Sequence, residues 1–143
     1  MSFRQYAISG ISKARVLEKR ADIPADFDVE EILDVTFGRF LGDPRQVVSV
    51  KVRLSQRVAP LVEGRVFSKK QELRMLPSGD IELSFPASTA GPWPLYHVKG
   101  WVLSWGADCE VLEPAELREL VRKDLDAMRD TIARSGDRQR CRN

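Results

Sequence analysis

Alternating apolar and polar residues predict four short strands, each with one buried face. The first spans residues 47–54, with Val48, Val50, Val52 and Leu54 on its inward side and Ser49, Lys51 and Arg53 on the other. The next two span residues 71–76 and 80–86 and flank Pro77-Ser78-Gly79, a sequence typical of a hairpin turn. In the third, the residues expected to face inward are Ile81, Leu83 and Phe85. A fourth strand is predicted over residues 108–112, with Cys109 and Val111 facing inward.

Two segments with helical spacing connect these strands. Residues 57–64 predict a short helix, which tolerates Pro60 in its first turn. A second helix is expected to begin near residues 93–95 and to end at Gly106, with Val98, Val102 and Trp105 on one face. The order strand, helix, strand, strand, helix, strand predicts an α+β fold, a ferredoxin-like β-α-β-β-α-β sandwich with both helices on one face of an antiparallel sheet.

Further elements are predicted on both sides of this unit. Residues 22–28 are typical of a linker, and Asp28 is a good N-cap, with Glu31 three positions later, for a helix that Gly38 closes. Pro114 is expected to start a final helix that ends at Ser135-Gly136. We expect its apolar stripe to pack on the crossover helices, to cover the opposite sheet face or to meet another subunit. The stripe consists of Leu117, Val121, Leu125, Met128 and Ile132.

The predicted domain organisation has four parts. Residues 3–15 alternate weakly and are expected to form a strand that belongs to another sheet. We therefore assign residues 1–20 to a remnant of another domain, 21–46 to the linker and short helix, 47–133 to the ferredoxin-like unit with its final helix, and 134–143 to a disordered basic tail.

Composition fits one soluble globular domain. The 143 residues are 43% hydrophobic and 31% charged, and no apolar run approaches the roughly 18 residues of a membrane span. The N-terminus lacks the features of a secretory signal, so we expect a cytoplasmic protein without membrane contact. The two cysteines predict no disulfide, and Cys109 is expected to be a small buried hydrophobe.

The net charge of +2 is unevenly distributed, and basic residues gather in the first half of the predicted sandwich. Several of them are expected to line one rim of the sheet, where guanidinium and ammonium groups suit an anionic partner. The alternative is a solvated face of mixed charge. The basic residues chosen as candidates for ligand binding are Lys51, Arg53, Arg57, Arg65, Lys69 and Lys70.

No pattern predicts catalysis, a metal or a cofactor. The single histidine, His97, has no other ligand at metal-binding spacing, and neither a phosphate loop nor a nucleophile elbow occurs. Trp101 and Trp105 are four residues apart on an apolar helix, which favours core packing over base stacking. Trp93, between two prolines, is retained as a candidate contact for an unpaired base.

Several segments resemble, in order, the C-terminal (WCX-type) extension of bacterial WYL-domain transcriptional regulators. The similarity covers about residues 20–133 and is strongest over residues 98–118, VKGWVLSWGADCEVLEPAELR. Other matching segments are IPADFD at 23–28, VKVRLS at 50–55 and EGRVFSKKQ at 63–71. Residues 1–20 resemble the closing strand of the WYL barrel itself, although the Trp-Tyr-Leu triplet that names that domain does not occur.

The resemblance implies a regulatory function. In this family an N-terminal winged helix-turn-helix, absent from this sequence, binds promoter DNA, while the WYL domain and its extension sense an effector and mediate dimerisation. The resemblance implies that the effector is a short single-stranded nucleic acid or another anion, with Arg65 and Gln71 among its contacts. A purely structural dimerisation domain is the first alternative. An enzyme acting on a small metabolite is the second, because ferredoxin-like folds host many activities.

Overall fold

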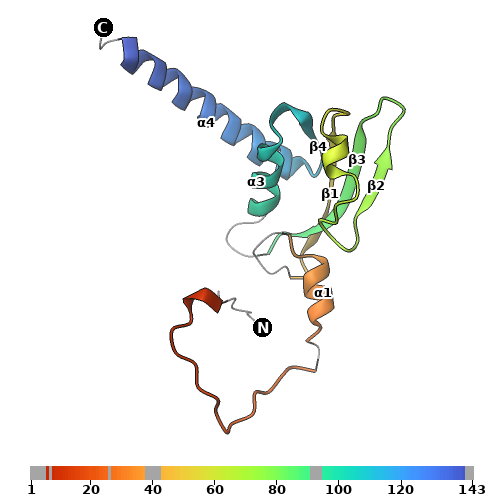
Figure 1. Cartoon of the computed structure of the whole chain (residues 1–143), viewed down its shortest axis with the longest axis vertical. Coiled ribbons are helices and arrows are strands. Elements are labelled where there is room, and N and C mark those ends of the chain that lie inside the picture. Colours follow the sequence, from red (N-terminus) through yellow and green to blue (C-terminus); the bar gives the residue numbers. More distant parts are fainter. Residues whose placement is uncertain (1–5, 7, 26, 38–42, 91–94, 141–143) are drawn as a thin grey trace.

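A four-stranded antiparallel sheet forms the centre of the protein, with strand order β2-β3-β1-β4 (Figure 1). The computed structural model describes residues 6, 8–25, 27–37, 43–90 and 95–140, with side chains up to residue 134. The strands are β1 (Val47–Leu54), β2 (Glu72–Met75), β3 (Ile81–Ser88) and β4 (Cys109–Glu113). This order and the antiparallel pairing confirm the predicted α+β, ferredoxin-like fold.

The inward face of β1 follows the predicted alternation. Val50, Val52 and Leu54 are fully buried, and Val48 is partly buried at the start of the strand. In the central pair of strands, Val50 lies opposite Phe85 and Val52 opposite Leu83. Because cross-strand neighbours share a face, these residues form a continuous apolar layer.

The hairpin between β2 and β3 forms at the predicted turn. Leu76 donates its backbone N–H to the carbonyl oxygen of Asp80 at 2.8 Å, and Gly79 adopts a φ of 86°. A side chain at Gly79 would be strained in this left-handed conformation, and its Cβ would come within 3.2 Å of the Gln56 side chain. Ile81, Leu83 and Phe85 face the core, as predicted.

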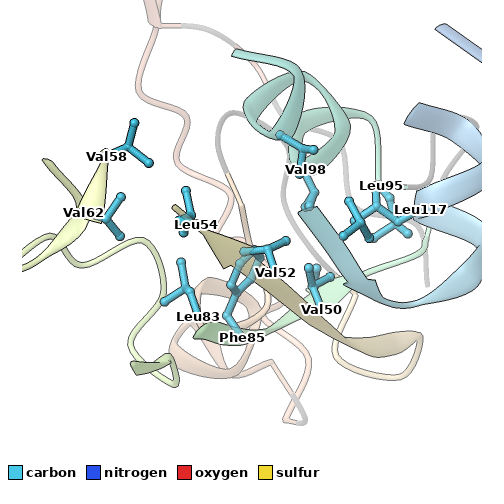
Figure 2. Close-up of a cluster of buried hydrophobic side chains, with 13 residues drawn as sticks. Val50, Val52, Leu54, Val58, Val62, Leu83, Phe85, Leu95, Val98 and Leu117 are labelled. Carbon is cyan, nitrogen blue, oxygen red and sulfur yellow. The ribbon is translucent and has the colours of Figure 1, made fainter. Parts of the chain in front are cut away.

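Two crossover helices cover the apolar face of the sheet. Helix α2 (Ala59–Val62) is short and carries Pro60 in its first turn, and α3 (Tyr96–Ser104) ends two residues before the left-handed Gly106, where a 3-10 turn (Gly106–Asp108) begins. The expected start of α3 near residue 93 falls partly outside the described residues, and the helix begins at Tyr96 after Leu95. Figure 2 shows side chains from both crossovers, including Val62 and Val98, gathered over β1 and β3 in one core.

The last helix, α4 (Ala115–Arg140), follows β4 and projects well beyond the sheet (Figure 1). Its predicted end at Ser135-Gly136 is wrong, because the helix continues to Arg140. One interior glycine costs a helix only about 1 kcal/mol, and an established helix propagates more easily than it starts. Membrane-spanning helices are not found in the described part of the chain.

Helix α1 (Val29–Asp34) begins as predicted, because the Asp28 carboxylate accepts hydrogen bonds from the N–H groups of Glu30 and Glu31. It ends earlier than expected, with Val35 as its C-cap. The Thr36 hydroxyl donates to the carbonyl oxygen of Ile32 at 2.6 Å, and such side-chain bonds compete with helix continuation. Gly38, the expected terminator, lies outside the described residues.

The strand expected within residues 3–15 is not found where the structure describes this segment. Residues 8–10 form a 3-10 turn, Ile8–Gly10, and the chain from 11 to 20 has no regular structure. Ile8 and Val16 are almost fully exposed. A strand needs a neighbour to satisfy its backbone groups, and none of the four strands in the described residues pairs with this segment.

Candidate functional site

The seven residues predicted to bind a ligand do not form one site. Lys51 and Arg53 lie on the sheet face opposite the helices, and Arg57 follows β1 at the end near Asp108. Residues 65–71, which connect α2 to β2, lie at the other end of the sheet against α1. The predicted basic rim is therefore divided into three places.

On the open sheet face, Arg53 is held by carboxylates from both neighbouring strands. Its guanidinium lies 3.3 Å from the Glu82 carboxylate on β3 and 3.5 Å from that of Glu110 on β4. Cross-strand pairing places Arg74 next to Glu82, so charges alternate in sign along this row of the sheet. An arginine between two carboxylates is a poor site for an anion. Lys51 lies on the same face and is partly buried.

Arg57 belongs to a cluster of hydrogen-bonded polar side chains at the end of the sheet where β1 ends and β4 begins. Its guanidinium donates to Asp108, which also accepts a hydrogen bond of 2.7 Å from the Ser55 hydroxyl. The hydrogen bond from Arg57, and then that from Ser55, lowers the pKa of Asp108, while the same carboxylate raises the pKa of Arg57. This arrangement ties β1 to the turn before β4, so Arg57 has a structural role.

The Gln71 side chain bonds to the backbone of the connection between α2 and β2. Its side-chain oxygen accepts from the N–H groups of Phe67 and Ser68, at 2.7 and 3.3 Å, and its amide nitrogen donates to the carbonyl of Arg65 at 2.7 Å. The resemblance implies a ligand contact at Gln71, but the polar atoms of this side chain already form hydrogen bonds with the backbone. We call residues 65–71 the basic loop, since this amide holds Arg65, Lys69 and Lys70 on one folded segment.

Two lysines of the basic loop are paired with helix α1. Lys69 donates to the Glu30 carboxylate, and Lys70 lies 2.9 Å from that of Asp34. Hydrogen bonding to these carboxylates raises the pKa of both lysines. In the sequence, the signal for this pair of carboxylates is the spacing of Glu30 and Asp34, which are four residues apart on one helix face.

Arg65 differs from the two lysines of the basic loop. Its side chain is exposed, and within the described residues no carboxylate forms an ion pair with it. The guanidinium is thus available for a phosphate or carboxylate in a bidentate geometry. Among the predicted residues, Arg65 is the best-placed contact for an anion.

The aromatic residues mostly belong to the core. Trp101 packs edge-on against Phe85 and Trp105, with ring centroids 6.1 and 5.9 Å away, which agrees with the predicted core packing. Trp93 lies outside the described residues. Burial raises the pKa of the Cys109 thiol to about 12, so it is protonated at neutral pH and unreactive.

Comparison with known protein families gives a match to most of the folded unit. The model of a protein family described as the WCX domain matches residues 46–129, which is more than half of the chain. No curated protein matches the sequence. The matched segment includes all four strands, both crossover helices and the first half of α4, together with the basic loop.

Proposed function

The chain belongs to the WCX domain family, the regulatory C-terminal region of WYL-type regulators, and on this premise we propose that it senses an anionic effector in the cytoplasm and joins copies of the regulator. The coarse function, a regulatory domain, follows from the family. The effector and the self-association are our proposals, and each is supported by a different surface of the protein.

The basic loop is the observation that supports effector binding best. It presents three cationic side chains within six residues, and the Gln71 amide fixes its backbone. Lys69 and Glu30 form a pair whose side chains are 59% and 64% exposed, and such surface pairs contribute little to stability. A ligand with several phosphates can therefore replace the Glu30 carboxylate as the partner of Lys69. The same ligand can also bind the free guanidinium of Arg65.

We expect Arg65→Ala to weaken binding of a short fluorescent single-stranded oligonucleotide about threefold to tenfold, measured by anisotropy. One lost phosphate contact also reduces the slope of log affinity against log salt by about 1. Lys123→Ala is the control, because it removes one positive charge from an exposed position on α4 outside the apolar stripe and its charged flanks. An equal loss in both variants would contradict a site at the basic loop, and binding that does not depend on salt would contradict phosphate recognition.

A variant of α1 provides the opposite test of the same site. Glu30→Gln removes the charge that competes for Lys69 and keeps the size of the side chain. Binding of the oligonucleotide should become severalfold tighter, because the lysine no longer has to exchange one anion for another. Glu116→Gln on α4 controls for the change in net charge. Weaker binding in Glu30→Gln would show that α1 supports the ligand rather than competing with it.

Self-association is supported by the projecting part of α4. Its inward stripe begins with buried Leu117 and half-buried Val121 and then continues over three exposed residues, Leu125, Met128 and Ile132. The flanks of this stripe differ in charge, with Asp124 on one side and Arg122 and Arg129 on the other. A second α4 running in the same direction brings Arg129 next to Asp124, which also pairs with Lys99 of its own chain, as in a coiled coil. We propose a second copy of the chain as the partner of this stripe.

Replacing Met128 with lysine should lower the molar mass in solution, measured by light scattering over a concentration series. The charge would lie in the apolar contact, where it loses hydration without a partner. Ala127→Lys adds the same side chain on an exposed position away from the stripe and should leave the mass unchanged. If wild type and Met128→Lys have the same mass at every concentration, α4 is not the contact.

A further inference from the structure

The two edges of the sheet differ in what lies beside them. The first part of α4 lies against β4, where its Arg118 donates to the carbonyl oxygens of Val111 and Leu112. Beyond β2, Figure 1 shows no further element, and all four residues of the strand are exposed. Edge strands with free backbone groups are templates for pairing with another strand.

The hairpin fixes which backbone groups of β2 are free. Leu76 donates its N–H across the hairpin to Asp80. Backbone groups of an antiparallel strand alternate sides, so the N–H and C=O groups of Leu73 and Met75 are directed away from β3. On the helix side of the sheet, these two residues also expose 38% and 56% of their surface. The β2 edge thus offers both hydrogen-bonding groups and apolar side chains.

The charges of β2 complement those of a second β2. In an antiparallel pair centred on Leu73, Glu72 of each copy lies opposite Arg74 of the other, and the two Leu73 side chains meet on the helix face. Shifting the centre to Arg74 would place two arginines opposite each other. The order Glu-Leu-Arg therefore favours this register.

We propose that the β2 edge pairs with the β2 edge of a second copy, centred on Leu73, so that two sheets join into one of eight strands. This contact deepens the proposed self-association and rests on it in part, but it uses the edge opposite α4. Charged edge residues commonly prevent strand pairing. Here the two charges have opposite signs on alternate residues, so they exclude most strands and match a copy of the same strand.

The test uses the full chain carrying Met128→Lys, which removes the α4 contact. We expect this variant to form a dimer of about twice the 16.2 kDa of one chain at high concentration. Adding Glu72→Arg places arginine opposite arginine twice and should raise the dissociation constant at least tenfold. Adding Arg74→Glu as well restores opposite charges in both pairs and should restore the dimer.

The substitutions at Glu72 and Arg74 differ in their effect within one chain. Within one chain Glu72 lies opposite Ser84, so Glu72→Arg creates no like-charge pair inside the sheet. Arg74→Glu does create one, with Glu82, and recovery of the dimer despite this cost would support the contact between copies. A monomeric Met128→Lys variant, an unaffected Glu72→Arg dimer, or a charge swap that stays monomeric while folded by circular dichroism would each overturn the β2 proposal. The α4 contact is tested separately, by comparing the molar mass of the wild type with that of Met128→Lys.

Discussion

Replacement of Leu117 with alanine is expected to lower the free energy of unfolding by about 2–5 kcal/mol. Leu117 is fully buried where α4 leaves β4, and it joins the same core as Val98 and Val111. Deleting most of its side chain removes apolar burial and leaves a cavity that surrounding strands cannot fill without moving. Urea denaturation followed by circular dichroism at 222 nm measures the change.

Ile132→Ala is the matched control for this prediction. Ile132 lies on the same stripe of α4 but is 71% exposed, so its truncation should change the unfolding free energy of the monomer by no more than about 0.5 kcal/mol. The comparison is made at a concentration where the chain is monomeric, because self-association would add stability of its own. Equal destabilisation by the two substitutions would contradict the division of α4 into a docked first part and a projecting second part.

The docked part of α4 determines where the projecting part lies. Besides Leu117, the helix is fastened by Lys99 of α3, whose ammonium lies 2.7 Å from the Asp124 carboxylate, and by Arg118, which binds carbonyl oxygens of β4. These contacts come from α3 and β4, so the direction of α4 is set by the core rather than by its own sequence. A change at Leu117 should therefore also weaken association through Met128, about three turns farther along the helix.

The sheet was predictable from the sequence because its signal is local. Alternation along β1 and β3 and the turn at Gly79 specify strand faces and register without knowledge of any distant residue. The order of elements then leaves few topologies, and the right-handed crossover rule selects among them. The burial of Val50, Val52, Leu83 and Phe85 confirms this part of the prediction.

The candidate site was less predictable because it depends on contacts between distant segments. Basic residues between 51 and 71 share a charge, but the fold separates Arg57 from Lys69 and gives each its own carboxylate. Gln71 carries a side chain suited to a ligand, yet the chain closes on itself and uses that amide internally. The predicted ends of α1 and α4 were wrong for a related reason, because a sequence prediction uses the average helix propensity of each residue. The end of α1 depends instead on the hydrogen bond of the Thr36 side chain, and α4 continues through Gly136 because the helix is already formed before it.

The second large effect is expected at Phe85, where alanine should destabilise the protein by about 3–5 kcal/mol. Phe85 is 2% exposed and stacks on Phe37 with ring centroids 4.9 Å apart. It also packs edge-on against Trp101 of α3, so one ring joins the sheet, the segment after α1 and a crossover helix. Its loss removes both aromatic contacts as well as the burial, and chemical denaturation measures the cost.

Two further variants separate the causes of this effect. Phe85→Leu keeps an apolar side chain in the core and should cost clearly less than Phe85→Ala, with the remainder reporting the aromatic contacts. Phe27→Ala makes the same truncation at a residue that is 41% exposed, and it should cost much less than either. Tryptophan emission should shift to longer wavelength in Phe85→Ala, because water gains access to Trp101. Unchanged emission together with a loss below about 1 kcal/mol would contradict the central position of Phe85 between the sheet and α3.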